Sequence, residues 1–222
     1  MTTPLVLLDL DGTLMESAPG ITASAAHAYR TLGLPVPDDA TLRSFVGPPI
    51  IDSFPAHGVP PERVAEAVAA YRAAFSAGGM FDNAVFDGMP AALRHLRAAG
   101  CTLAVATSKP EVYARPICER FGLTELLDDV FGAPPDEQGT KADVIAKALA
   151  TLGRHSPAAP EDGPVLMVGD REHDVHGASE HGIDCLGVAW GYAAPGELEA
   201  AGAVGLVHDV AGLVPEVLAR LR

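Results

Sequence analysis

The stretch Leu5-Val6-Leu7-Leu8-Asp9-Leu10-Asp11-Gly12-Thr13 decides the fold of this 222-residue chain. It begins with four apolar residues in a row, a pattern typical of a short strand buried on both faces of a parallel sheet. The run then changes abruptly to acidic and small residues, and the glycine lets the backbone turn close to a ligand. Because open α/β sheets bind ligands at the carboxyl ends of their strands, this stretch predicts an α/β fold with a polar site.

Two further apolar runs, at residues 103–106 and 165–168, end in polar clusters in the same way. We interpret residues 130–131 and 185–189 as weaker strands of the same sheet. Helical patterns lie between the strands, and three of them have ordinary start and stop signals. These three cover residues 90–99, 141–152 and 174–181.

The part of the chain that follows the first motif is different, because no strand-like run interrupts its helical patterns. The later of its two patterns starts after Pro60-Pro61 and places Val64, Val68, Tyr71 and Phe75 on one face, as expected for helix packing. The sequence therefore predicts a core formed by residues 1–14 and 86–222, with a helical insertion at residues 15–85.

Charge and cysteine content exclude several classes of protein. The chain has 15 Lys and Arg against 29 Asp and Glu, a formal charge of −14, which disfavours nucleic acid as a partner. Three cysteines at wide spacings, without a C-x-x-C, encode neither a disulfide framework nor a zinc knuckle. The N-terminal apolar run is too short for a signal peptide or a membrane span, so we expect a cytoplasmic protein with no membrane partner.

Seven polar side chains follow the three main strands or begin a later helix, and we expect them to converge. They are Asp9, Asp11, Thr107, Ser108, Lys141, Asp170 and Asp174. Four carboxylates and one lysine give this site a net charge of −3, and two carboxylates about 4 Å apart repel by roughly 4 kcal/mol at an effective dielectric of ~20. The site therefore needs a cation, and oxygen ligands without His or Cys favour Mg²⁺.

A carboxylate nucleophile, a second carboxyl group for proton transfer and a metal are the parts needed for phosphoryl transfer through an aspartyl-phosphate. With a divalent metal bound, Lys141 and nearby backbone amides are able to hold a phosphate dianion. The residues thus predict phosphoryl transfer through an aspartyl-phosphate.

Residues 9–14, 105–108, 139–141 and 169–174 resemble, in this order, the four motifs of the haloacid dehalogenase superfamily. The resemblance implies a Rossmann-like three-layer core with a parallel sheet and a small helical cap inserted after the first motif. The chain most resembles the branch of phosphoglycolate phosphatases and bacterial 5′-nucleotidases. The run Gly169-Asp170-Arg171-Glu172-His173-Asp174 and the cap sequence Gly47-Pro48-Pro49 carry this finer likeness.

The resemblance also implies a role for each acidic residue. Asp9 is then the nucleophile, and Asp11 first protonates the leaving oxygen and later activates water. Mg²⁺ would bind the side chains of Asp9 and Asp170 and the backbone carbonyl of Asp11. Asp174 would bind a metal-bound water or orient Lys141.

The phosphate group has its own expected partners. By the same resemblance, Thr107 donates a hydrogen bond to a phosphate oxygen, and the amides of Gly12 and Ser108 lie nearby. Lys141 neutralises charge that develops on the phosphoryl group. His173 is interpreted as a surface histidine beside an acidic loop.

Several functions remain open at this point. A dehalogenase needs neither Asp11 nor Asp170, so both favour phosphate chemistry. A phosphosugar mutase shares every motif and differs in its products. A non-catalytic phospho-acceptor or regulatory protein is the remaining alternative, although no catalytic residue is missing. The substrate, the oligomeric state and the protein partners are not encoded in the motifs.

Overall fold

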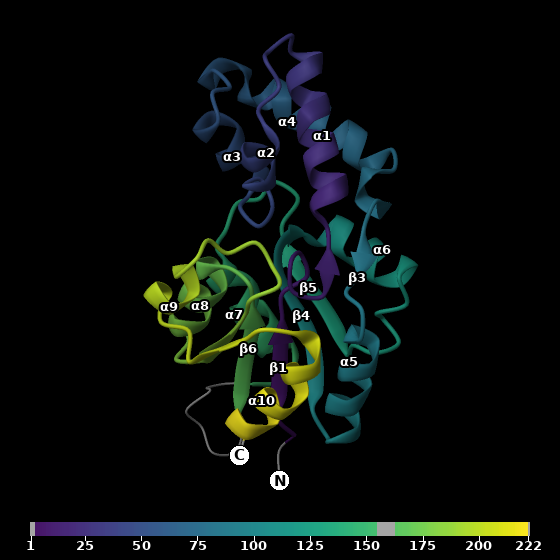
Figure 1. Ribbon diagram of the computed structural model, residues 1–222. Helices are drawn as coiled ribbons and strands as arrows, with labels where there is room; N and C mark the ends of the chain where they lie inside the picture. Colours follow the sequence, from purple (N-terminus) through teal and green to yellow (C-terminus); the bar gives the residue numbers. More distant parts are fainter. Residues whose placement is uncertain (1–2, 155–162, 222) are drawn as a thin grey trace.

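The computed structural model describes residues 3–154 and 163–221 and shows an α/β core with a helical unit above one edge of its sheet (Figure 1). The core sheet has six parallel strands in the order β5-β4-β1-β6-β7-β8. The strands are β1 (Leu5–Leu8), β4 (Thr102–Pro110), β5 (Asp129–Ala133), β6 (Val165–Gly169), β7 (Asp184–Val188) and β8 (Gly205–Val207). This is the expected Rossmann-like fold class.

Helices cover both faces of the sheet, as the continuous apolar strands require. Val6 and Leu8 face one layer, while Leu5 and Leu7 face the other, because successive side chains of a strand alternate. The first layer contains α5 (Met89–Ala98), α6 (Glu111–Arg120) and α10 (Leu213–Arg220). The second contains α7 (Lys141–Thr151), α8 (Glu172–Ser179) and α9 (Glu197–Ala201).

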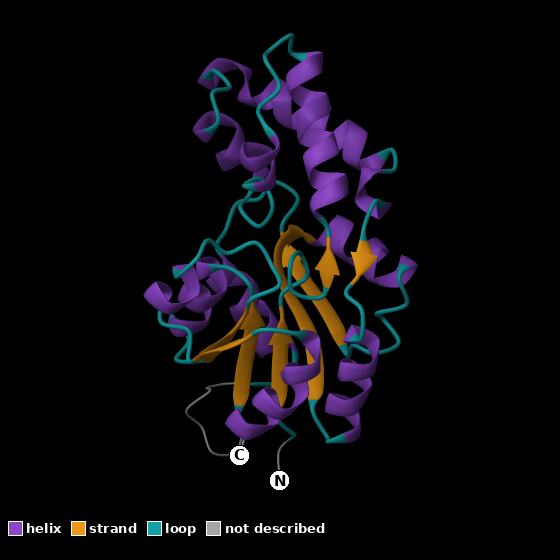
Figure 2. Cartoon of the chain, viewed as in Figure 1, coloured by secondary structure: helices purple, strands orange, loops and turns teal. Residues whose placement is uncertain are grey.

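The helical unit lies between two short strands, β2 (Met15–Glu16) and β3 (Ala84–Val85), which pair in antiparallel fashion. We call the segment between these strands the cap. It contains α1 (Ala18–Thr31), α2 (Asp39–Arg43), α3 (Ile50–Ala56) and α4 (Val64–Ser76), with short 3-10 turns at Pro61–Arg63 and Gly79–Phe81. Figure 2 shows these helices above the strands of the sheet.

Aromatic packing holds the cap together. Phe45 and Phe54 are buried with ring centroids 5.3 Å apart, and Tyr71 stacks on Phe75 at 5.4 Å. Tyr71 and Phe75 belong to the apolar face expected for α4. These rings belong to the same hydrophobic cluster as one face of the sheet, and their burial stabilises the cap because each aromatic side chain removes a large area from water.

The sequence patterns locate most of the sheet, but not its last strand. β8 has only three residues and includes a glycine, so it lacks the apolar run that marks the other strands. β4 is longer than its apolar pattern and continues through Thr107 to Pro110. Among the described residues, no helix combines the length and the hydropathy required to cross a bilayer.

Candidate active site

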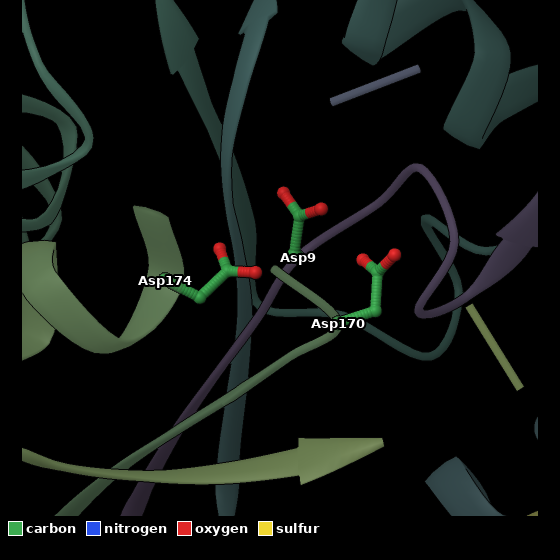
Figure 3. A group of neighbouring side chains, drawn as sticks. All are labelled: Asp9, Asp170 and Asp174. Atoms are coloured by element: carbon green, nitrogen blue, oxygen red, sulfur yellow. The ribbon is translucent and has the colours of Figure 1, made fainter. Parts of the chain in front are cut away.

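The site lies where β1, β4 and β6 end, directly beneath the cap. β1 pairs with β4 on one side and with β6 on the other, so the segments that follow these three strands meet at one edge of the sheet. From β1, the strand order continues through β4 and β5 on one side and through β6, β7 and β8 on the other. The order therefore reverses at β1, and α/β sheets bind ligands at such a switch point. Asp9, Asp170 and Asp174 come together there (Figure 3).

These three aspartates form a compact acidic cluster. Each offers a carboxylate oxygen, and the three oxygens lie within 4.8 Å of one another. Burial, and then the charge of Asp9, raises the pKa of Asp170 well above its ordinary value. Burial and Asp9 also raise the pKa of Asp174, to about 6, although the neighbouring Lys141 opposes this shift. The cluster therefore holds more negative charge than the chain alone stabilises.

Lys141 is the first residue of α7, and the helix start fixes its position. Thr140 and Asp143 form a capping box: the Asp143 amide donates to the Thr140 hydroxyl, and the Thr140 amide donates to the Asp143 carboxylate. The buried Lys141 ammonium lies 2.6 Å from Asp9 and 2.7 Å from Asp174. Although its burial opposes the charge, these two carboxylates keep the pKa of Lys141 above its ordinary value.

A second lysine, Lys109, belongs to the site and was not expected. Its ammonium lies 2.8 Å from an Asp11 carboxylate oxygen, and both side chains are almost fully buried. The net charge of four carboxylates and two lysines is −2, not the −3 inferred from the sequence. The signal was present, because Lys109 belongs to the polar run Thr107-Ser108-Lys109 that follows the apolar residues 103–106. The apolar pattern ended too early to include it in the strand.

Asp170 is held by partners other than Lys141. The Thr13 hydroxyl donates to Asp170 Oδ1 at 3.2 Å, and the backbone amide of Tyr192 donates to Oδ2 at 2.8 Å. Gly12 packs against the same carboxylate: a Cβ atom there would lie 2.3 Å from Asp170 Oδ2, and its φ is +84°. Gly12 thus permits its own loop to approach the loops that carry Asp170 and Tyr192. Gly12, which was expected to bind substrate, is not among the residues that line the pocket around Asp9.

The acidic cluster fits a hard divalent cation. Asp170 has no cationic partner among the described residues, whereas Asp9 and Asp174 share the single ammonium of Lys141. Three converging carboxylates without a sulfur or imidazole ligand are a donor set that suits Mg²⁺. Asp9 and Asp170 are the residues that would hold the ion by their side chains, with Asp174 close enough to contribute.

A small pocket around Asp9 gathers most of the other expected residues. It is lined by Asp9, Asp11, Gly47, Thr107, Ser108, Lys141, Arg171, His173 and Asp174. Thr107 is buried at the end of the apolar part of β4, and its hydroxyl accepts a hydrogen bond from the Lys109 amide at 3.3 Å. His173 lines the pocket, and burial together with Arg171 lowers its pKa.

Two core side chains contact the cap beside this pocket. Arg171 donates to the backbone carbonyl of Val46 at 2.9 Å and to Glu197 at 2.8 Å. Glu137, which has a positive φ of 57°, accepts from the Ile50 amide at 2.8 Å and from Arg72 at 2.7 Å. Neither Arg171 nor Glu137 was a candidate from the sequence, since each acts through a contact between distant segments.

Comparison of the chain with known protein families agrees with the fold and with this arrangement of aspartates and lysines. Residues 6–188 match the family described as haloacid dehalogenase-like hydrolase. This match covers most of the chain, so the protein belongs to the haloacid dehalogenase-like hydrolases, as the four motifs predicted.

Relatives within this family carry different names. The chain is 47% identical over 189 residues to a tyrosine-protein kinase PtkA from Mycobacterium tuberculosis (strain ATCC 25618 / H37Rv), covering 85% of this chain but only 62% of that protein. It is 39% identical to a 5′-nucleotidase from Pseudomonas aeruginosa, covering 95% of this chain and 93% of the relative. The crystal structure of a predicted phosphatase from Clostridium acetobutylicum superposes with a TM-score of 0.90 at 39% identity, covering 99% of this chain and all of that one.

Proposed function

We propose that the protein is a Mg²⁺-dependent phosphatase that hydrolyses the phosphomonoester of a small metabolite through an aspartyl-phosphate on Asp9. The observation that carries this proposal is the division of the two loop carboxylates between two lysines. Asp9 contacts Lys141, and Asp11 contacts Lys109. Two neighbouring aspartates are thereby held in separate environments, as two separate chemical roles require.

Asp9 and Asp170, by their side chains, and Asp11, by its backbone carbonyl, would hold Mg²⁺, which would supply positive charge that attracts the phosphoryl group and counters repulsion from the carboxylates. Lys141 adds an ammonium 2.6 Å from Asp9. Thr107 and Ser108 line the same pocket as Asp9, which supports a role of the Thr107 hydroxyl and the Ser108 amide in orienting phosphate oxygens. These groups stabilise the negative charge that develops on the phosphoryl group in the transition state.

The first step starts with Asp11 in its protonated form. An Asp9 carboxylate oxygen attacks phosphorus, the bond from phosphorus to the ester oxygen breaks, and Asp11 gives its proton to that oxygen. In the second step, water attacks the phosphorus of the aspartyl-phosphate and gives a proton to Asp11. The bond to Asp9 then breaks, and inorganic phosphate leaves. The second step returns a proton to Asp11 and frees the carboxylate of Asp9, so both aspartates end in the state in which they began.

The formal charge of −14 and the small pocket favour a small molecule over nucleic acid as the substrate. Specificity resides in the cap, because the groups around Asp9 contact only the phosphoryl group. Nucleoside 5′-monophosphates, 2-phosphoglycolate and sugar phosphates are the substrate classes to compare.

The test is phosphate release from a panel of these esters, with Mg²⁺ and with EDTA, by the wild-type protein and by Asp9→Asn. We expect turnover that requires Mg²⁺ and falls by roughly 10⁴ or more in the variant. With an aryl phosphate, whose leaving group needs no proton from Asp11, Asp11→Asn should accumulate phosphorylated Asp9, detected by mass spectrometry after reduction of the acyl phosphate. Phosphorylation of Asp9 without phosphate release would indicate a mutase or a phospho-acceptor, and substantial hydrolysis by Asp9→Asn would refute the nucleophile.

A further inference from the structure

The pocket around Asp9, which we call the phosphoryl site, is adjoined by a second pocket. Asp11 lies at the boundary between the two pockets. We call the second pocket the leaving-group pocket, and its principal lining residues are Phe45, Tyr71, Arg72, Phe75, Tyr113 and Glu137. It shares Asp11, Gly47 and Ser108 with the pocket around Asp9. A phosphoryl group seated against Asp9 therefore directs the rest of the ester past the proposed acid, Asp11, into this second pocket.

Aromatic rings form much of the wall of the leaving-group pocket. Tyr71 and Phe75 of the cap stack with ring planes 14° apart, and Phe75 meets Tyr113 of the core edge to face at 5.3 Å. The rings are thus fixed by one another before any ligand binds. Such walls favour flat rings, because an aromatic pair contributes energy beyond the area it buries.

Every charge on this pocket is already paired within the chain. Lys109 contacts Asp11 at 2.8 Å, and Arg72 contacts Glu137 at 2.7 Å, so the four charged side chains that line it sum to zero. Glu137 also accepts the Ile50 amide, which holds its carboxylate in place. The buried Nε of Arg72 has no hydrogen-bond partner among the described residues, but Glu137 already balances the charge of Arg72. A second anionic group on a ligand would therefore lack a counter-charge of its own, and burial of an unpaired charge is costly.

The pocket has one neutral polar group to offer. This group is the hydroxyl of Tyr71, whose side chain lines the pocket and is only 5% exposed. Burial and the carboxylates of Asp11 and Glu137 raise the pKa of Tyr71, so the hydroxyl stays protonated. It is able to donate one hydrogen bond to a polar atom on a bound ring.

The leaving-group pocket is also narrow. Its volume is about 40 Å³, and one water needs roughly 10–15 Å³ on this measure, so about three waters fit. This space is smaller than a six-membered ring, so even a flat ring requires a small outward shift of the cap. A thick or branched occupant has to push the cap outward, which would disturb the contacts of Glu137 with Arg72 and Ile50. A thin occupant disturbs them least.

We propose that the leaving-group pocket binds an uncharged, flat ring, and that the protein selects phosphomonoesters of ring-bearing alcohols over esters that carry a second anion, such as 2-phosphoglycolate. This inference rests on the proposed function for one point only, the seating of the phosphoryl group against Asp9. The selectivity follows from the aromatic walls, the paired charges and the narrow shape.

Non-hydrolysable phosphonates test the pocket separately from catalysis. In the presence of Mg²⁺, calorimetry would compare benzylphosphonate with cyclohexylmethylphosphonate, which has a puckered ring, and with phosphonoacetate, which carries a second anion. We expect the flat ring to bind roughly 2- to 10-fold more tightly than the puckered one, and more tightly still than phosphonoacetate. Equal or tighter binding of phosphonoacetate, or no binding of benzylphosphonate, would overturn the proposal.

Matched variants show which wall is responsible. Tyr113→Leu should remove the preference for benzylphosphonate over the cyclohexyl analogue, whereas Tyr113→Phe should keep it. A 4-hydroxybenzylphosphonate should bind more tightly than benzylphosphonate, and Tyr71→Phe should abolish only this difference. If both Tyr113 variants fold and bind like the wild type, the aromatic wall plays no part and the proposal is wrong.

Glu137→Gln supplies a test by gain of binding. The amide still accepts the Ile50 hydrogen bond but leaves Arg72 without its carboxylate, so the affinity for phosphonoacetate should rise while that for benzylphosphonate stays similar. An unchanged affinity for phosphonoacetate would contradict the role of charge pairing. If benzylphosphonate binds as expected and no ester in the panel is hydrolysed, the proposed function fails and this inference stands. If esters are hydrolysed but phosphonoacetate binds most tightly, the proposed function stands and this inference fails.

Discussion

The ammonium of Lys109 lies 2.8 Å from the carboxylate of Asp11, and neither side chain is more than 9% exposed. The same ammonium lies 4.9 Å from the centre of the Phe75 ring of the cap. Lys109 is therefore a core residue that contacts both the proposed acid and the cap. It orients the Asp11 carboxyl group at the boundary between the phosphoryl site and the leaving-group pocket.

Lys109→Met should destabilise the protein by about 3 kcal/mol, because it leaves a buried carboxylate without its partner. Urea unfolding measures the change. The double variant Asp11→Asn, Lys109→Met should recover most of this loss, since it removes the orphaned charge. Turnover should fall in both variants. A Lys109→Met protein as stable as the wild type would show that water screens this ion pair fully.

Gly12→Ala should abolish Mg²⁺-dependent activity. Its Cβ atom would lie 2.3 Å from Asp170 Oδ2 and 2.6 Å from Tyr192 Cδ2, so one of the two loops has to move. Gly33→Ala is the matched control, because Gly33 also has a positive φ, +66°, but no atom within 4 Å of the added carbon. The control should lose only about 1–2 kcal/mol of stability from backbone strain and keep its activity. Equal activity losses in the two variants would mean that the contact with Asp170 is unimportant.

The metal-free protein should lose stability as the pH rises from about 5 to 7. Burial raises the pKa values of Asp170 and Asp174 in the folded state, that of Asp174 to about 6, against roughly 3.9 for an unfolded aspartate. In this window the folded state binds more protons than the unfolded state, so the free energy of unfolding falls with pH.

Thermal unfolding in EDTA at pH 5 and pH 7 checks this prediction. Asp170→Asn should flatten the pH dependence, because it removes one of the three clustered carboxylates. Mg²⁺ should stabilise the wild type more at pH 7 than at pH 5, since protons and the cation compete for the same oxygens. Identical pH profiles for wild type and Asp170→Asn would contradict the assignment of this cluster as the main titrating group.

Arg171→Leu should raise KM about tenfold with a smaller effect on overall stability. The guanidinium donates to the Val46 carbonyl beside Gly47 and is held by Glu197, so its loss frees the cap segment that covers the phosphoryl site. A tenfold change in KM corresponds to the loss of one hydrogen bond from a charged donor. Arg97→Leu is the control, because its ion pair with Asp128 is largely exposed and lies on the core. A KM that rises equally in both variants would argue against a specific role of Arg171.

Local sequence was enough to predict where the main catalytic candidates would lie. Asp9, Thr107 and Asp170 each follow an apolar run, and parallel strands bring their carboxyl ends together whatever the rest of the chain does. The start of α7 at Lys141 was predictable for a similar reason, since the helix pattern begins there and Thr140 and Asp143 cap it. These features depend on residues that are close in sequence.

Contacts between distant segments were not predictable in this way. Nothing near Glu137 in the sequence indicates that its carboxylate meets Arg72 and the Ile50 amide, and Tyr192 holds Asp170 by a backbone amide that any residue carries. The pairing of Lys109 with Asp11 also required the register of β4 beyond its apolar part. Such contacts depend on how the cap and the loops pack.

The sequence by itself determined the α/β class, the family motifs and the edge of the sheet at which the candidate site residues lie, because hydrophobic periodicity and strand ends are local properties of the chain. Only the tertiary structure decided how the charges are shared, with Lys141 at Asp9, Lys109 at Asp11 and a narrow aromatic pocket beyond them. The physical reason is that electrostatic pairing and pocket shape depend on distances of a few ångströms between segments far apart in sequence, which no local pattern fixes.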